Sequence, residues 1–236
     1  MTLGFLEEAK RLIISAYGLG DQGWKSGLED SMDTVLKYWD AAWVTFHGYD
    51  RGDGDTGRDC APYGTGEARS ADFGLQGDVT YTIESSFIRG RNILQSMARG
   101  RGSGRAVFVR ESDMIVLRSA YDTITEAIII TYLRSTLQQV SRMDRNVPTF
   151  PANMRVHQLE GYAFFRSIEP FASNASDAAA AHIASVLAIG TNLPREDGTI
   201  DVAEYASHAA SVEAAINELL ESLEIDKEAQ FGRLIV

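Results

Sequence analysis

Two ionisable residues in the segment 157–170, HQLEGYAFFRSIEP, have the spacing of a metal half-site. His157 and Glu160 stand at positions i and i+3, which lie close together on one face of a helix. An imidazole nitrogen and a carboxylate oxygen at that spacing can reach one ion, and the pair suits iron or another divalent cation. The alternative interpretation of His157 is a structural histidine in the core or at its rim, which is the more common role of this residue.

The apolar pattern of the same segment predicts a helix that is buried on most sides. Large apolar residues fall on both faces at about 100° per residue, with Phe164 and Ile168 on the face of Glu160. A carboxylate inside such a helix must be paired, liganded or protonated. The metal hypothesis therefore depends on Glu160 lying inside the bundle with an oxygen free to bind. If Glu160 is exposed to solvent, this hypothesis fails and only a helical protein without an assigned function remains.

The end of this helix is predicted from its last residues. Arg166 and Glu169 are again at i and i+3, so we expect them to form an ion pair. Pro170 lacks a backbone N–H and its ring clashes with the preceding turn, so the helix is predicted to end there.

Three acidic residues of other predicted helices are further candidate metal ligands. Glu84 lies beside the buried stripe of a helix predicted over residues 77–97. Asp122 and Glu126 stand at i and i+4 in a helix predicted over 111–142, where they can present two carboxylates to a facing helix. The alternative for each is an ion pair with an arginine, because buried carboxylates are usually paired.

Helical periods dominate the chain, and strand signals are nearly absent. We therefore predict an all-α fold, a single-domain helical bundle of about six or seven helices over residues 1–236. The helix at 111–142 is apolar nearly all round in its middle, which predicts a long central helix. Gly90 is expected to let a neighbouring helix approach. Further helices are predicted over residues 3–16, 28–46, 175–189 and 201–223, and loops over 48–65 (acidic and Gly-rich) and 98–105 (Gly- and Arg-rich).

The composition and net charge of the chain limit the kinds of partner that we expect it to bind. The 236 residues are 44% hydrophobic and 23% charged, which is ordinary for a globular protein. The net charge of -11 disfavours nucleic acid and anionic membranes as partners, and no apolar run is long enough for membrane insertion. The single cysteine, Cys60, excludes a disulfide within the chain. The amino-terminal residues do not have the pattern of a secretory signal.

Two short segments resemble the signature segments of the algal iron-assimilation proteins, the low-iron-inducible and high-CO2-inducible periplasmic family. The first is APYGTGEARSADFG and the second is LEGYAFFRSIEP, and they occur in the same order and at similar separation. The residues that carry the resemblance are Tyr63, Arg69, Phe73 and Gly74 in the first segment, and Glu160, Gly161, Ala163, Phe164, Arg166 and Ile168 in the second.

The resemblance implies a secreted or periplasmic protein that binds iron, or another metal ion, during iron assimilation. The first alternative is a ferroxidase of the di-iron bundle type, which usually needs a Glu-x-x-His sequence on each of two helices. No Glu-x-x-His occurs in this chain. The second alternative is a helical module that binds a small organic ligand or a partner protein. No nucleophile triad, phosphate loop or zinc cysteine cluster is present, so the sequence predicts no catalytic residue.

Overall fold

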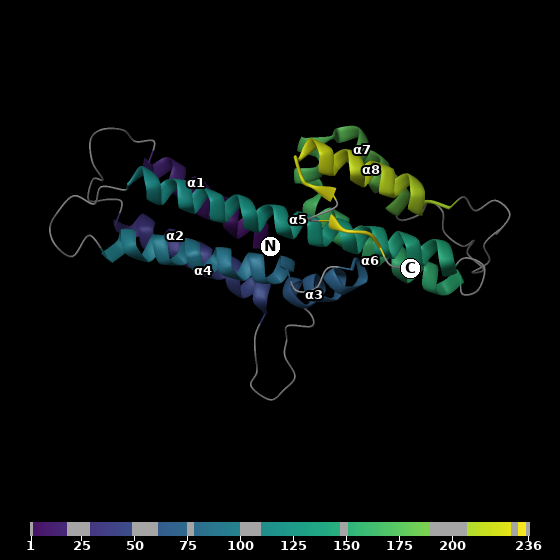
Figure 1. Cartoon of the computed structure of the whole chain (residues 1–236), viewed down its shortest axis with the longest axis horizontal. Helices are drawn as coiled ribbons and strands as arrows, with labels where there is room; N and C mark the ends of the chain where they lie inside the picture. The colour runs from purple at the N-terminus through teal and green to yellow at the C-terminus, as the bar shows by residue number, and fades with distance from the viewer. Residues whose placement is uncertain are drawn as a thin grey trace, which may run out of the picture. The chain divides into compact units, whose positions relative to one another are not determined.

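A computed structural model of the chain describes residues 2–17, 29–48, 61–74, 78–99, 110–146, 151–188, 207–227 and 231–234. These ranges contain eight α-helices and no strand, so the predicted all-α fold is confirmed (Figure 1). The helices are α1 (Thr2–Tyr17), α2 (Glu29–His47), α3 (Pro62–Asp72), α4 (Asp78–Arg99), α5 (Glu111–Asn146), α6 (Pro151–Ala175), α7 (Asp177–Leu187) and α8 (Ala209–Ser222). Among these helices, none combines the length and apolarity that a bilayer span requires.

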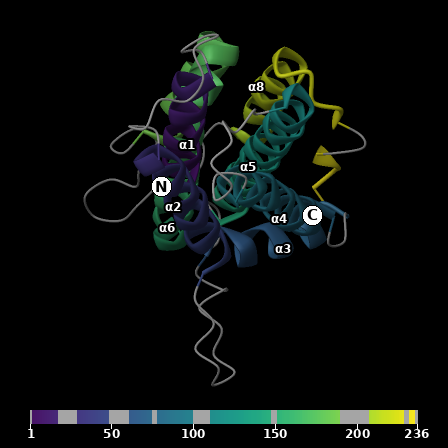
Figure 2. The ribbon, with the colours of Figure 1, turned by 90° about the vertical axis from the view of Figure 1, so that its left-hand side faces the viewer.

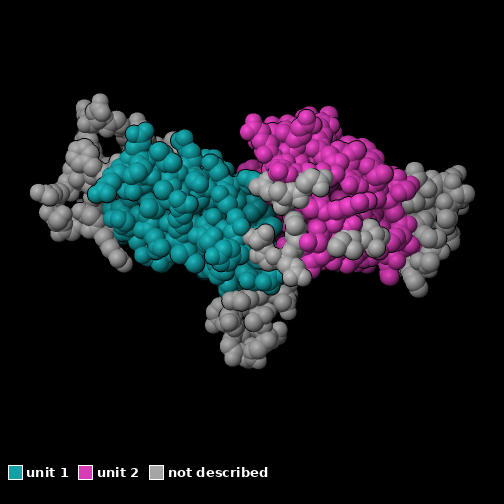
Figure 3. Space-filling model, in the orientation of Figure 1, with its two compact units in different colours: residues 1–68, 77–128 teal, residues 69–76, 129–236 magenta. Residues whose placement is uncertain are grey.

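The chain divides into two compact units (Figure 3). Unit 1 comprises residues 1–68 and 77–128, and unit 2 comprises residues 69–76 and 129–236. The 36-residue helix α5 contributes its first half to unit 1 and its second half to unit 2. The prediction of a long central helix is confirmed, since residues 127–140 are buried except for the half-buried Tyr132. The single-domain prediction stays a prediction.

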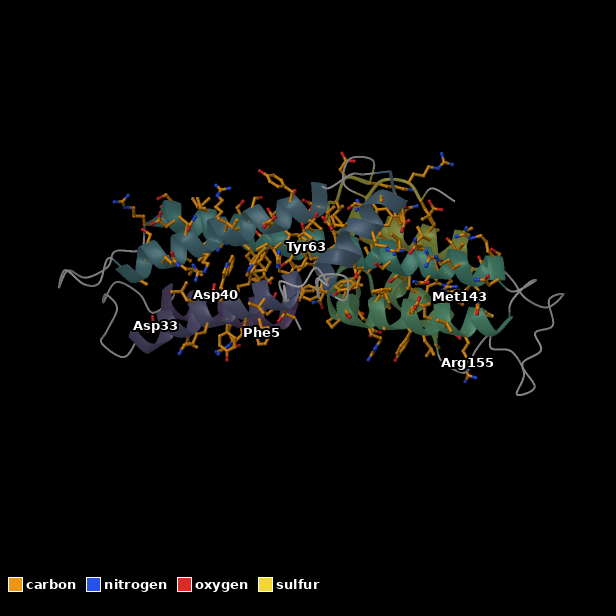
Figure 4. The ribbon with its side chains drawn as sticks, turned by 90° about the horizontal axis from the view of Figure 1, so that it is seen from below. Phe5, Asp33, Asp40, Tyr63, Met143 and Arg155 are labelled. Carbon is orange, nitrogen blue, oxygen red and sulfur yellow. The ribbon has the colours of Figure 1, made fainter. Side chains whose placement is uncertain are left out.

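Unit 1 is built around the packing of α2 against α1 and α4; α1 and α2 lie side by side in Figures 1 and 2. Trp39 of α2 is 1% exposed, and its Nε1 donates a hydrogen bond of 3.0 Å to the carbonyl oxygen of Phe87 in α4. A Cβ atom on Gly90 would lie 2.1 Å from Cζ2 of Trp39. The indole ring therefore occupies the space that Gly90 leaves, as the sequence predicted for a close approach. At the rim, Asp40 (labelled in Figure 4) pairs with Arg91 at 2.7 Å.

Unit 2 packs α7 between α6 and α8. Gly161 of α6 allows the close approach, because a Cβ there would lie 2.9 Å from Leu187 Cδ2 in α7 and 3.3 Å from Gln139 Cβ in α5. The hydroxyl of Ser176 accepts a 3.2 Å bond from the amide of Ala179 and so caps the start of α7. The same hydroxyl donates to Glu218 of α8. These contacts join α6, α7 and α8 to one another, and they join α6 to the second half of α5.

The start of α8 is capped by a residue from a different helix. His208 stands at the N-cap, but its side chain makes no capping hydrogen bond. The carboxylate of Asp144 in α5 accepts from the amides of His208 and Ala209, the latter at 2.8 Å, and from the hydroxyl of Ser207 at 2.7 Å. Charge-assisted bonds of this kind satisfy the free N–H groups of a helix terminus.

Replacing Asp144 by alanine is expected to lower the free energy of unfolding by about 1–2 kcal/mol, because the amides at the start of α8 lose their acceptor. Urea denaturation of the two proteins measures the difference. Asp122→Ala is the matched control, since Asp122 is an exposed aspartate of the same helix. The control is expected to change stability by less than about 0.5 kcal/mol. Equal losses in both variants would show that Asp144 does not act as a cap.

Helix α6 passes through Pro170 and ends at Ala175, so the prediction that Pro170 ends the helix is wrong. Pro170 cannot donate to the carbonyl of Arg166, one turn earlier. The buried residues Ile168 and Ala172, at 0% and 1% exposure, lie on either side of the proline and hold the helix through it. The expected ion pair of Arg166 with Glu169 is present.

Several predicted boundaries also need correction. The loop predicted over 48–65 ends earlier, because α3 begins at Pro62, whose fixed backbone suits the first turn of a helix. The loop predicted over 98–105 begins later, because α4 continues to Arg99. The last helix begins at Ala209, not at residue 201. The remaining parts of these predictions, residues 49–60, 100–105 and 201–206, lie outside the described residues.

Candidate metal centre and a buried arginine cluster

Glu160 of α6 is exposed, with 47% of its side chain accessible, so the prediction of a buried carboxylate is wrong. The buried face of α6 consists of Met154, Gln158, Gly161, Phe165, Ile168 and Ala172. Gly161 lies on this face, where α6 approaches α5 and α7 closely. Glu160 is about 100° away from Gly161 and turns outward. The apolar pattern had two competing faces, and packing against the neighbouring helices decided between them.

His157 is half-buried, with 17% of its side chain accessible. Its Nδ1 atom lies 2.8 Å from Oε1 of Gln139, a buried residue of α5, and 3.7 Å from Oε2 of Glu160. Burial lowers the pKa of the imidazole, Glu160 raises this pKa, and Arg142 and Arg145 lower it further. The net effect is a pKa below the ordinary histidine value of about 6.5, so the ring is mostly neutral at pH 7.

The other three candidate ligands belong to unit 1, whereas His157 and Glu160 belong to unit 2. Glu84 of α4 and Glu126 of α5 are half-buried, and Asp122 of α5 is exposed. Across the described ranges, no group of three or more His, Cys, Asp or Glu side chains is arranged to hold a metal ion. In the part of the chain that the structure describes, the candidate metal centre is thus the two-residue pair His157 and Glu160.

Sequence reasoning missed a cluster of buried and half-buried polar residues in unit 2. It consists of Arg69, Ser70 and Asp72 of α3 with Arg134 and Gln138 of α5, and we call it the arginine cluster. Arg134 is 0% exposed; its Nε donates at 2.8 Å to the carbonyl of Phe231, and its Nη1 donates at 3.4 Å to the hydroxyl of Ser70. Burial lowers the pKa of Arg134 to about 10. The guanidinium thus remains charged in the core at neutral pH.

The remaining members of the arginine cluster meet at Asp72. Nη1 of Arg69 lies 2.9 Å from Oδ2 of Asp72, and the side-chain amide of Gln138 donates to the same oxygen. The guanidinium of Arg134 lies 5.7 Å from the ring centre of Phe73 and 5.8 Å from that of Phe231. These cation–π contacts offset part of the cost of burying the charge. The sequence signal that could have located the cluster is Arg134, an arginine in an otherwise apolar stretch of helix.

The two segments that carry the family resemblance both contact the second half of α5. The first segment contributes Arg69, Ser70 and Asp72 to the arginine cluster, and its Phe73 ring lies 5.7 Å from the guanidinium of Arg134. The second contributes Gly161, which packs against Gln139. No family model, curated protein or solved structure matches this chain. The resemblance to the algal iron-assimilation proteins therefore stays a prediction from these two segments.

Proposed function

We propose that this protein binds iron, or another divalent metal ion, at His157 with Glu160 as the second ligand. The resemblance adds the setting of this activity, which is iron assimilation by a secreted or periplasmic protein. The buried carboxylate that first suggested a metal site is absent, so the proposal now rests on His157. No catalytic step is part of it.

The state of His157 is the observation that supports the proposal. Its pKa is lowered, so the ring offers a lone pair without first losing a proton. The 2.8 Å contact with Gln139 Oε1 is suited to a proton on Nδ1, which leaves Nε2 as the ligand atom. Metal-binding histidines commonly have such a partner on the second nitrogen, because it fixes the ring and the tautomer. The exposed Glu160 side chain can rotate toward the same ion.

The charges around His157 limit the affinity of this site. Glu160 attracts a cation, whereas Arg142 and Arg145 repel it. Two protein ligands also leave most coordination positions to water or to a small chelator that arrives with the metal. We therefore expect weak binding and fast exchange, which suits the delivery of a metal ion better than its storage.

Titration of the purified protein with ferrous ion, without oxygen, tests the proposal by calorimetry. His157→Ala is expected to weaken binding by about tenfold or more, since loss of even an outer partner of a ligand has an effect of that size. Arg142→Gln is expected to strengthen binding, because it removes a repelling charge. Acidification should release the metal as His157 becomes protonated.

His182→Ala is the matched control, because His182 is an exposed histidine of α7 in the same unit. It is expected to bind ferrous ion as the unaltered protein does. The proposal fails if the unaltered protein binds no metal, or if His157→Ala and His182→Ala have the same affinity. Consumption of dioxygen with oxidation of ferrous ion would instead favour the ferroxidase alternative.

A second candidate function is a helical module that binds a small organic ligand in unit 2. The arginine cluster favours it, because cationic and amide groups are costly to bury unless they have a task or complete partners. Gln138 is 4% exposed, and its buried Oε1 has no hydrogen-bond partner among the described residues. Binding of this kind needs no metal ion and is tested separately below.

A further inference from the structure

The arginine cluster contains buried polar atoms that no described residue satisfies. Nε and Nη1 of Arg69 are buried and have no hydrogen-bond partner among the described residues. The contact of Nη1 with Asp72 is close, at 2.9 Å, but it lacks hydrogen-bond geometry. Oε1 of Gln138 is buried and likewise has no partner in the described ranges. Each such group is expensive to leave unpaired, which marks the cluster as incomplete.

The types of these atoms define the ligand that would complete the cluster. The two unpaired N–H positions of Arg69, Nε and Nη1, each need an oxygen acceptor, and a carboxylate oxygen at either one accepts a charge-assisted hydrogen bond. An amide oxygen needs a donor, and a hydroxyl beside the carboxylate supplies one. The charge of the cluster also suits an anionic ligand, because the charges of Arg69, Asp72 and Arg134 sum to one positive charge. The side chains of Arg69 and Asp72 are 17% and 34% exposed, so solvent reaches this edge of the cluster.

We propose that the arginine cluster binds a small hydroxycarboxylate. The carboxylate accepts hydrogen bonds from Arg69, and the hydroxyl donates to Oε1 of Gln138. Arg134 adds positive charge from the core and holds Ser70 beside the site. This inference rests on the second candidate function, and it is independent of the metal site at His157.

Thermal unfolding of the full chain with three small probes tests the inference. Glycolate has the carboxylate and the hydroxyl, acetate lacks the hydroxyl, and glycolamide lacks the charge. All are compared at one ionic strength set with sodium chloride. Glycolate is expected to raise the melting temperature in a saturable way, because it binds only the folded state. We expect glycolate to bind about tenfold more tightly than acetate, since acetate leaves Gln138 unpaired, and glycolamide to cause no shift.

Variants assign the binding to the named atoms. Arg69→Gln is expected to abolish the glycolate shift, and Gln138→Met is expected to reduce glycolate to the affinity of acetate. Arg166→Gln is the matched control, because Arg166 also pairs with a carboxylate at i+3 in unit 2 but is exposed. It should respond to glycolate as the unaltered protein does. If Arg69→Gln does not fold by circular dichroism, Arg69→Lys serves, with about a tenfold loss expected because an ammonium lacks the paired N–H groups.

Three results would overturn the inference. The first is that glycolate stabilises the protein no more than chloride does, as expected if water alone fills the cluster. The second is an equal loss in the Arg69 and Arg166 variants. The third is a saturable shift with glycolamide alone, which refutes the anion but leaves the small-ligand function standing. The ferrous titration of the His157 variant decides the metal proposal whatever these results are.

Discussion

Replacing Gly90 by alanine is expected to destabilise the protein by about 1–2 kcal/mol. The new Cβ would lie 2.1 Å from Cζ2 and 2.6 Å from Cη2 of Trp39, so the indole ring or the helix must move. Trp39 is 1% exposed and hydrogen-bonded to Phe87, which leaves the ring no free space. Overpacking of a core commonly costs about 1–3 kcal/mol, and the better helix propensity of alanine returns only about 1 kcal/mol. Urea denaturation measures the loss.

Two further variants isolate the steric cause. Gly4→Ala in α1 is the matched control, because no atom lies within 4 Å of the position of its Cβ. It should leave stability unchanged or raise it by up to about 1 kcal/mol. In a Trp39→Phe background, the second ring of the indole is gone, so Gly90→Ala should cost about 1–2 kcal/mol less. An unchanged cost in that background would rule out the contact with Trp39 as the cause.

Replacing Phe165 by alanine is expected to lower the free energy of unfolding by about 3–5 kcal/mol, because it empties a buried position in the core of unit 2. Phe165 is 0% exposed, whereas its neighbour Phe164 is half-buried, and its ring is tilted against that of Tyr132 with the ring centroids 6.0 Å apart. The experiment therefore tests which face of α6 is buried. Thermal or urea unfolding measures the difference.

Leu159→Ala is the control on the outward face of α6, where Leu159 is 43% exposed and precedes Glu160 in the chain. A change of less than about 0.5 kcal/mol is expected. If instead Leu159→Ala costs several kcal/mol and Phe165→Ala costs little, α6 is rotated about its axis.

Local patterns were sufficient to predict most helices. The stripe through Trp39 and Phe46 predicted α2, and the long run at 111–142 predicted α5 to within a few residues at its end. Gly90 was correctly predicted as a point of close approach. The helix α3 was missed, because Gly64 and Gly66 are poor helix formers and the segment resembles a loop. Pro170 was wrongly taken as a helix end, because packing on both sides of a proline cannot be seen in the chain itself.

The candidate sites were less predictable than the helices. The spacing of His157 and Glu160 predicted their proximity, and the two side chains do lie 3.7 Å apart. Their burial depended on the rotation of α6, and two apolar faces of similar strength left that rotation open. The arginine cluster joins α3 to α5 across 64 residues of sequence, from Ser70 to Arg134. The periodic pattern of apolar residues within one helix cannot predict a contact between residues so far apart in the sequence.

The sequence by itself therefore determined the helices and the all-α class, because helical period and propensity act over a few neighbouring residues. It also placed His157 and Glu160 within reach of each other, since that depends on one turn of one helix. Only the tertiary structure decided which of them is buried, what surrounds His157 and where the arginines gather. Those properties arise when one helix packs on another, and the sequence of α6 alone did not decide which of its two apolar faces turns inward.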